Sequence, residues 1–190
     1  ELGLGTAQLG MTYGNADLPM GEAEALRILR TAEAGGVRHF DTASAYGLAE
    51  ERIIKSGIKG SFITKVPNIP WAKHYLKERP TANWIVLMHD PVEENYRPTA
   101  SMVATMNYRI GVSVYTMDEA LSALKSHWPK YSVLQVPINV IDRRFADPDF
   151  VRICKAQHVT LVGRSLLLQG VLVPGEPLPH VRRAPWLYEL

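Results

Sequence analysis

Short apolar runs alternate with segments of helical periodicity along most of the chain. The short runs are rich in Val, Ile and Leu, as is typical of buried strands, and the segments between them repeat their apolar residues every three or four positions. The period of roughly 25 residues is the length of a βα unit, so the pattern predicts parallel strands joined by right-handed crossovers. The seven predicted strands are residues 2–7, 37–40, 61–66, 84–88, 109–115, 133–139 and 160–166.

Helices are predicted between these strands, with recognisable starts and stops. A helix that begins at Glu22 and buries residues 25, 26, 28, 29 and 32 is expected to end at Gly35-Gly36. A second, with Ile53 and Ile54 directed inward, is expected to end near Gly57. The remaining predicted helices are a short one at 71–78, one at 99–107, one after a Thr116/Glu119 capping box that buries Leu121 and Leu124, one from Asp147-Pro148 to His158 that buries Cys154, and the start of one at 186–190.

The ends of the strands decide between an open doubly wound sheet and a closed barrel, which share this alternation. Six of the seven strands present a polar or small residue toward or just beyond their C-terminal end, as expected when all strands point toward one rim. We therefore predict an α/β fold, a (β/α)8 TIM barrel, whose eighth strand and C-terminal helices are absent from the chain. The residues at the strand ends are Thr6, Asp41, Lys65, His89, Ser113 and Gln135.

The length of 190 residues agrees with one domain but is short for such a barrel, which typically needs about 250 residues. A seven-stranded ring with an open edge would leave backbone groups unpaired and prone to aggregation. We therefore expect residues 1–190 to form a single barrel domain that is incomplete at its C-terminus and in its loops, within a longer protein.

Composition and charge exclude several classes of partner. Lys and Arg number 21 against 19 Asp and Glu, with no basic run, so neither nucleic acid nor a membrane surface is expected as a partner. Cys154 is the single cysteine, which excludes an intrachain disulfide, and no apolar run approaches the ~18 residues that span a bilayer. A cytoplasmic protein is expected, without a metal and as a monomer or weak homo-oligomer.

Four reactive side chains are expected to meet at the rim. A phenol such as that of Tyr46 has a pKa of about 10 and is a poor proton donor near neutrality, but a cation within ~4 to 6 Å lowers that pKa by about one to three units. Lys65 is suited to be the cation and Asp41 to hold it as an ion-pair partner. His89 would orient a substrate carbonyl, whose oxygen Tyr46 would protonate.

This arrangement needs a hydride donor that no side chain supplies, so the sequence predicts a nicotinamide cofactor. Ser113 and Gln135, on the next two strands, are suitable polar groups for its carboxamide. The Gly-rich turn at Gly5 would let a ligand approach the backbone closely.

Motifs in most of the predicted strands resemble those of the aldo-keto reductase family. The matching segments are Leu4 to Met11, Asp41-Thr42-Ala43 to Tyr46-Gly47 with Glu50, Thr64-Lys65, His89-Asp90-Pro91, Ile110 to Ser113, Leu134 to Asn139, and Arg164-Ser165 to Gln169-Gly170, the last typical of a bacterial subgroup. The resemblance departs at Val114, where family members usually have Asn. The segments between residues 11 and 21, 66 and 83, and 91 and 109 are also shorter than usual.

The resemblance implies a (β/α)8 barrel that reduces an aldehyde or ketone with NADP(H). It implies catalytic roles for Asp41, Tyr46, Lys65 and His89, with a small carbonyl compound as substrate. The resemblance and the small residues of the first strand together give the expected cofactor-binding residues. These are Gly5, Thr6, Asp41, Ser113, Gln135, Arg164, Ser165, Leu167 and Gln169.

Two other functions remain open. A catalytically idle member of the family would bind nucleotide and act as a regulatory or interaction subunit. An unrelated phosphate-binding barrel lyase or isomerase would use Lys65 as a Schiff-base nucleophile. Asp41 and Tyr46 fit that chemistry less well, and no Gly-rich phosphate-binding loop follows the seventh predicted strand.

Overall fold

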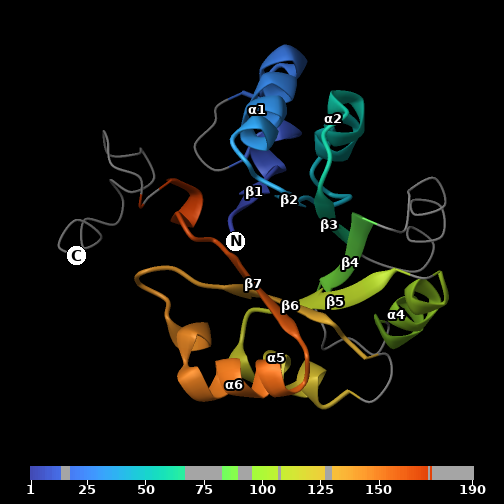
Figure 1. Cartoon of the computed structure of the whole chain (residues 1–190), viewed down its shortest axis with the longest axis vertical. Coiled ribbons are helices and arrows are strands. Elements are labelled where there is room, and N and C mark those ends of the chain that lie inside the picture. Colours follow the sequence, from blue (N-terminus) through green and yellow to red (C-terminus); the bar gives the residue numbers. More distant parts are fainter. Residues whose placement is uncertain are drawn as a thin grey trace.

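A computed structural model describes residues 1–13, 18–66, 83–89, 96–106, 108–126, 130–170 and 172. These residues form one parallel sheet of seven strands that are paired in chain order, with β1 and β7 at its edges (Figure 1). The strands are β1 (Gly3–Gly5), β2 (His39–Asp41), β3 (Ser61–Val66), β4 (Trp84–His89), β5 (Arg109–Ser113), β6 (Val133–Pro137) and β7 (Thr160–Arg164).

The sheet is strongly curved, because side chains from distant strands meet inside it. Gln135 on β6 donates a hydrogen bond from Nε2 to Oδ1 of Asp41 on β2, over 2.7 Å. In a flat sheet these strands would lie about 19 Å apart, since neighbouring strands are about 4.8 Å apart. The predicted parallel barrel architecture is therefore confirmed for the seven strands, which Figure 1 shows around a common centre.

Helices lie on the outside of this curved sheet, between consecutive strands (Figure 1). The predicted stops after the first two helices are confirmed: Gly35 caps α1, and Gly57 caps α2 in the left-handed conformation with φ of 71°. The helices are α1 (Glu22–Ala34), α2 (Ala49–Ser56), α4 (Tyr96–Thr105), α5 (Met117–Leu124) and α6 (Pro148–Ala156), and the 3-10 helices are η1 (Ala7–Leu9), η3 (Arg144–Ala146) and η4 (Leu168–Gly170).

The starts of the last two helices also agree with the sequence. Thr116 and Glu119 form the complete capping box of α5, and the Asp147 side chain accepts from the Phe150 backbone N–H at the start of α6. Cys154 is buried in the core, as expected. The sequence predicted both helix starts because each cap joins residues only three positions apart.

One prediction of a buried residue was wrong, and another was confirmed only in part. Ile54 is 59% exposed whereas its neighbour Ile53 is buried, because adjacent helical residues point about 100° apart and only one can face the sheet. On α5 the fully packed residues are Ala120 and Ala123, while Leu121 and Leu124 only partly cover the core.

The predicted limits of several elements also needed correction. Strand β1 ends at Gly5 and is followed by η1, whereas a strand through residue 7 was expected; β5, β6 and β7 likewise end two residues before their predicted limits. Strand β3 matches its prediction at both ends. The helices predicted at 71–78 and 186–190 lie outside the described residues.

Side chains alternate between the helix-facing side of the sheet and its inside, as the period of a strand requires. The outward residues Phe40, Phe62 and Trp84 stack in succession across three strands, with ring centroids 5.7 and 5.0 Å apart. They belong to the main core between sheet and helices, whereas Ile63, Leu87 and Val133 form a separate cluster inside.

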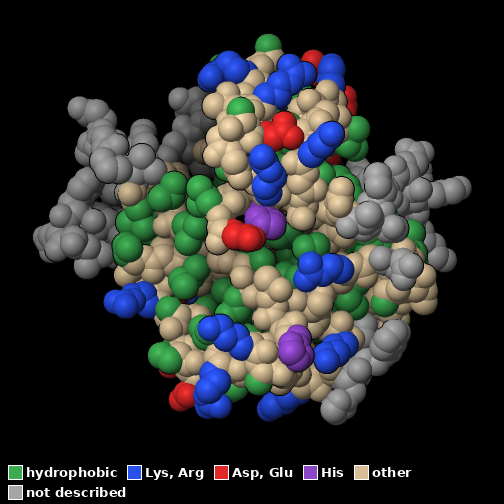
Figure 2. Space-filling model, viewed as in Figure 1, with side chains coloured by type: hydrophobic (Ala, Val, Ile, Leu, Met, Phe, Trp, Pro, Cys, Tyr) green, Lys and Arg blue, Asp and Glu red, His purple; other side chains and the backbone are tan. Residues whose placement is uncertain are grey.

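The surface carries scattered charge. On the face in Figure 2, Lys and Arg side chains occur over several elements from one end of the molecule to the other. None of the described helices is both long and apolar enough to cross a membrane. Among the described residues, no group of three or more His, Cys, Asp or Glu side chains has the arrangement of a metal site.

Candidate active site

An ion pair inside the barrel joins the ends of β2 and β3. Lys65 Nζ lies 2.8 Å from Asp41 Oδ1 and 2.9 Å from Asp41 Oδ2, and it also donates to the Thr42 carbonyl oxygen over 2.8 Å. These three acceptors match the three N–H groups of an ammonium. The pairing of Asp41 with Lys65 that the sequence predicted is therefore present. Together with the Thr42 carbonyl it engages all three N–H groups of the ammonium.

Tyr46 reaches the same place from the loop after β2. Its ring centre lies 5.2 Å from Lys65 Nζ, which is within the range of a cation–π contact. Close backbone packing fixes this loop: Gly47 has φ of 56°, and a Cβ at Gly10 would collide with the backbone of Tyr46 and Ala49. The two glycines thus allow the segment that carries the phenol to lie directly against the turn after β1.

The pKa of Tyr46 departs from the sequence expectation. Burial raises that pKa well above its ordinary value, and the Asp41 carboxylate raises it further, while Arg164 opposes the shift. The expectation that this pKa is lowered is wrong for this arrangement, because burial and then the Asp41 carboxylate raise it. The phenol is consequently held in its protonated form.

Burial has the opposite effect on Lys65, whose side chain is only 8% exposed. Burial lowers the pKa of its ammonium, and the contacts with Asp41 oppose that shift. Arg164 adds to the lowering, and Glu50 counteracts it. Lys65 is therefore a buried cation whose charged form is favoured by its contacts with Asp41.

A second chain of hydrogen bonds reaches Asp41 from the other side of the barrel. Ser113 Oγ donates to Gln135 Oε1 over 3.0 Å, and Gln135 Nε2 donates to Asp41 Oδ1 over 2.7 Å. Ser113 and Gln135 are both fully buried. The structure thus brings together Asp41, Lys65, Ser113 and Gln135, which the sequence placed at four strand ends.

His89 lies at the exposed end of β4, next to Ser113 in the register of the sheet. Its ring packs edge-on against Tyr115, with centroids 5.8 Å apart. Tyr115 is half exposed, so the histidine and this tyrosine form part of the open rim. The role of His89 in orienting a carbonyl stays a prediction.

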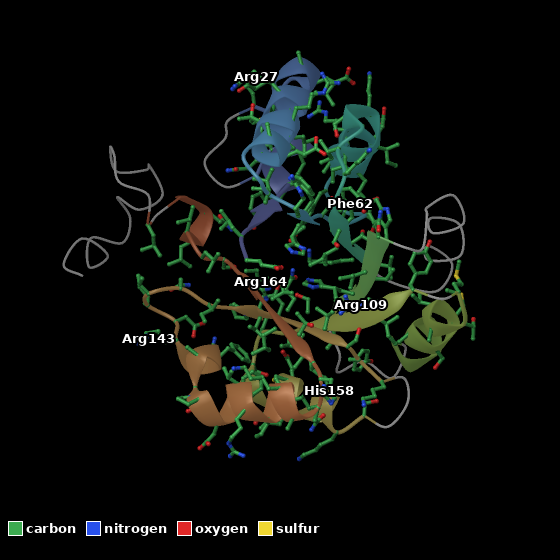
Figure 3. The ribbon with its side chains drawn as sticks, in the orientation of Figure 1. Arg27, Phe62, Arg109, Arg143, His158 and Arg164 are labelled. Atoms are coloured by element: carbon green, nitrogen blue, oxygen red, sulfur yellow. The ribbon has the colours of Figure 1, made fainter. Side chains whose placement is uncertain are left out.

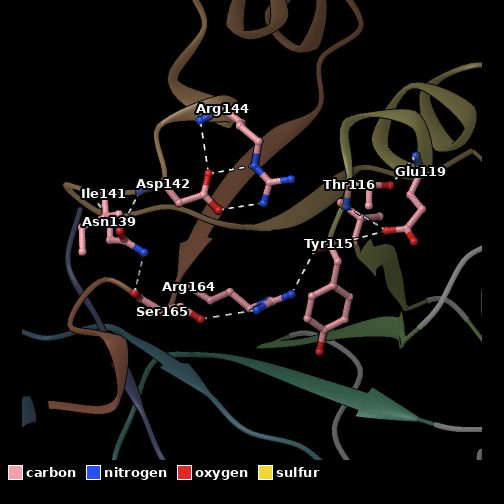
Figure 4. A network of polar contacts seen from close by, with 10 residues as sticks. Tyr115, Thr116, Glu119, Asn139, Ile141, Asp142, Arg144, Arg164 and Ser165 are labelled. Atoms are coloured by element: carbon pink, nitrogen blue, oxygen red, sulfur yellow. Dashed lines mark hydrogen bonds and ion pairs between the residues drawn. The ribbon is translucent and has the colours of Figure 1, made fainter. Parts of the chain in front are cut away.

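Arg164 closes the rim at the end of β7 (Figure 3), where it lies toward the middle of the strands while Arg27 lies outside on α1. Its guanidinium carbon lies 4.2 Å from the ring centre of Tyr115, and Nη2 donates to the Val114 carbonyl over 3.1 Å. Figure 4 shows these contacts and the bond from Nη1 to Ser165 Oγ. Arg164 Nε is buried and has no hydrogen-bond partner within the described part of the chain.

The loop after β7 has an unusual backbone. Ser165, Leu168 and Gln169 have φ of 61°, 45° and 57°, a region that side chains other than glycine seldom adopt. Gln169 Nε2 donates to the Tyr13 hydroxyl over 3.4 Å, and Leu167 is 56% exposed. Backbone strain of this kind tends to occur at ligand-binding segments.

The two residues proposed on β1 differ from each other. A Cβ added at Gly5 would meet nothing within 4 Å, so the space beside it is open. Thr6 is fully buried, and its hydroxyl donates to the Asp41 carbonyl over 3.0 Å, which holds the turn after β1 to β2. Cofactor binding by either residue stays a prediction.

Sequence reasoning missed two tyrosines of the rim. Tyr115 contacts both His89 and Arg164, and Tyr13 contacts Gln169. Tyr115 is the last residue of the predicted fifth strand, a position near the rim that could have suggested it. Tyr13 lies in a loop whose sequence contains no signal for its position.

Fold and site together define a parallel α/β barrel with a buried lysine–carboxylate pair and a protonated tyrosine at the carboxyl ends of its strands. Residues 1–79 match the model of the Aldo/keto reductase family. The resemblance to this family that the motifs indicated is thereby confirmed over residues 1–79. Comparison with curated proteins gave no match.

Solved structures of aldo-keto reductases share the fold. AKR11C1 of Bacillus halodurans, in its holo form, is 21% identical, with a TM-score of 0.71 over 94% of this chain and 66% of its own. AKR2E4 of Bombyx mori, in complex with NADP, is 18% identical, with a TM-score of 0.65 over 99% and 72%. MGS-M4, from a deep-sea metagenome of the Medee basin, is 20% identical, with a TM-score of 0.64 over 96% and 71%. This chain therefore covers about two thirds of the length of these proteins.

Proposed function

We propose that this protein reduces an aldehyde or ketone to an alcohol with NADP(H). The observation that carries the proposal is the buried Lys65–Asp41 pair beneath the ring of Tyr46, at the carboxyl end of parallel strands. Active sites of such barrels lie at this end. The family match over residues 1–79 covers all three of these residues.

The residues around the pair fit a nicotinamide cofactor. Ser113 and Gln135 offer a hydroxyl and an amide in the barrel interior, where a carboxamide would find both donors and acceptors. Arg164 Nε is a buried donor that lacks a partner among the described residues, and the space beside Gly5 is open. Ser165, Leu167 and Gln169 would hold the cofactor from the strained loop after β7. AKR2E4 of Bombyx mori was solved with NADP, which supports this choice.

The cofactor, when bound, would supply the hydride. The protein's own side chains donate the proton and stabilise the charge that remains. Tyr46 donates its phenolic proton to the carbonyl oxygen as the carbonyl carbon is reduced. His89 donates a hydrogen bond to the same oxygen and thereby orients the substrate. Lys65 stabilises the phenolate that remains, and Asp41 keeps Lys65 in place.

A Schiff-base mechanism at Lys65 draws support from the lowered pKa of its ammonium. The contacts of Lys65 oppose it, because both carboxylate oxygens of Asp41 and the Thr42 carbonyl accept from the protonated form. A nucleophilic amine needs a free lone pair, which this arrangement disfavours. We therefore favour proton donation by Tyr46.

The test is the oxidation of NADPH in the presence of a panel of small aldehydes and ketones. Tyr46→Phe should lower kcat/KM by about 10² to 10⁴, because it removes only the proton donor. Tyr131→Phe is the matched control, since Tyr131 is buried before β6 and takes no part in the site. It should retain the wild-type rate.

The alternative functions give different results in the same assay. NADPH binding without turnover in the wild type would favour the idle nucleotide-binding subunit. Equal rates for the wild type and Tyr46→Phe would exclude Tyr46 as the acid. Trapping of a carbonyl substrate on Lys65 by borohydride would favour the Schiff-base lyase.

A further inference from the structure

The resting arrangement of the ion pair poses a problem for proton transfer. All three N–H groups of Lys65 are matched by acceptors, and its contact with Tyr46 is through the ring face. A lysine that is to stabilise a phenolate must direct one N–H toward the phenolic oxygen. One of its present acceptors therefore has to release it.

Asp41 Oδ1 is the acceptor for which another group competes. It accepts from Lys65 Nζ over 2.8 Å and from Gln135 Nε2 over 2.7 Å, whereas Oδ2 accepts from Lys65 alone among the described residues. A carboxylate oxygen that accepts a second hydrogen bond offers less charge to the first donor. Lys65 Nζ lies at nearly equal distances from the two oxygens, 2.8 Å from Oδ1 and 2.9 Å from Oδ2, so the competition from Gln135 acts on the charge of Oδ1 and not on the length of the bond.

Gln135 is held in the orientation that this competition needs. Its Oε1 accepts from Ser113 Oγ, which fixes the amide so that Nε2 faces Asp41. Both side chains are fully buried, so water does not replace them readily. The Ser113 oxygen retains lone pairs that can accept from a carboxamide, so a ligand at Ser113 would polarise the whole chain of hydrogen bonds.

We propose that Gln135 is a positioning residue: its hydrogen bond reduces the charge that Asp41 Oδ1 offers to Lys65, so that an ammonium N–H can turn to the phenol of Tyr46. The inference rests on the proposed function. It gives Gln135 a role besides any contact with the carboxamide: Gln135 would control how strongly the Lys65 ammonium interacts with the phenol of Tyr46. The charged and titratable groups that act on Lys65 or Tyr46 are Asp41, Tyr13, Glu50, Tyr115 and Arg164.

The first test measures Lys65 directly and needs no activity. The ammonium of isotope-labelled Lys65 is followed by NMR against pH, and its signal is assigned by its loss in Lys65→Met. Gln135→Met keeps the length of the side chain nearly constant but removes the Nε2 donor. Asp41 then accepts hydrogen bonds from Lys65 but no longer from residue 135. The pKa of Lys65 should rise by about one unit, the worth of a hydrogen bond to a charged group.

Ser113→Ala provides a graded variant that leaves Gln135 in place. Without the Ser113 hydroxyl, Gln135 is less firmly oriented, so the rise in the pKa of Lys65 should be in the same direction but smaller. An unchanged or lowered pKa of Lys65 in Gln135→Met would overturn the proposal. If Gln135→Met does not fold, Ser113→Ala alone decides, since the absence of any rise there has the same meaning.

The second test separates positioning from cofactor binding. At saturating NADP(H), Gln135→Met should lower kcat by about 10- to 100-fold and move the alkaline pH profile of alcohol oxidation upward. A glutamine that only binds the carboxamide would raise KM for the cofactor and leave kcat at saturation unchanged. If the wild type turns over no carbonyl at all, the proposed function fails, while the NMR titration still decides the role of Gln135.

Discussion

Two layers inside the barrel come from the same strands yet differ completely in chemistry. One layer is apolar and the other polar, and they lie two residues apart along each strand, on the same face of the sheet. Toward the strand starts lie Ile63, Leu87, Gly111, Val133 and Val162, and two residues further along lie Lys65, His89, Ser113, Gln135 and Arg164.

Burial does not distinguish the layers, since Leu87 and Gln135 are both fully buried. The apolar layer gains about 1.5 to 3 kcal/mol for each large side chain that it removes from water. The polar layer gains little on balance, because the cost of desolvating charges such as Lys65 largely offsets the attraction between them. Stability should therefore reside in the first layer and chemistry in the second.

Lys65→Met should have the largest effect and should fall on activity. The substitution keeps the length of the side chain but removes the charge proposed to stabilise the Tyr46 phenolate, so kcat/KM should fall by about 10² to 10⁴. Carbonyl reduction measured with NADPH checks this, and circular dichroism checks that the variant is folded. Lys55→Met, at a half-exposed lysine paired with Glu22, is the matched control and should keep the wild-type rate.

Leu87→Ala should have the next largest effect and should fall on stability. Leu87 is fully buried between β3 and β5 in the interior cluster, so its truncation should lower the free energy of unfolding by about 2 to 5 kcal/mol. Urea denaturation measures this, with the same substitution at Leu18, which is 78% exposed, as the control. Similar losses at both positions would show that the interior layer does not carry stability.

The sequence predicted the polar layer because strand periodicity and strand ends are local. Lys65 in an otherwise apolar run, and Asp41 after a short strand, were enough to place them at one rim. The capping residues of α5 and α6 were equally local. The order of the strands followed from the chain connections that parallel sheets permit.

The sequence could not predict the hydrogen-bond and ion-pair partners of the charged side chains at the rim. The bond between Gln135 and Asp41 joins residues 94 positions apart, and it depends on the curvature of the whole sheet. The raised pKa of Tyr46 has the same origin, because burial and the position of the Asp41 carboxylate are properties of the folded site. The contact of Arg164 with Tyr115 likewise spans two strand ends.

Gly111→Ala tests how closely the apolar layer is packed, and its effect should be moderate. An added Cβ would lie 2.6 Å from Leu87 Cδ2 and would also meet the Val133 backbone, which cannot yield easily. We expect a loss of about 1 to 3 kcal/mol in the free energy of unfolding, measured by urea denaturation. Gly5→Ala is the control, since a Cβ there meets nothing within 4 Å.

Adding Leu87→Val to Gly111→Ala sharpens this test. The shorter side chain removes the methyl group that the new Cβ would meet, so part of the loss should be recovered if the two residues interlock. Strict additivity of the two substitutions would mean that Gly111 and Leu87 do not share the same space.

The smallest expected effect is a pH dependence that the polar layer alone should produce. The pKa of Tyr46 is raised in the folded chain, so above the ordinary tyrosine value of about 10 the unfolded chain loses a proton that the folded chain keeps. The contribution of Tyr46 to stability is therefore complete below about pH 10 and declines as the pH rises further. Burial lowers the pKa of Lys65, which gives the opposite slope below about pH 10. Comparing urea denaturation of the wild type and Tyr46→Phe at about pH 8 and pH 11 isolates the tyrosine, because Lys65 is common to both. A difference in unfolding free energy that stays constant between these pH values would mean that the phenol is not held protonated by its surroundings.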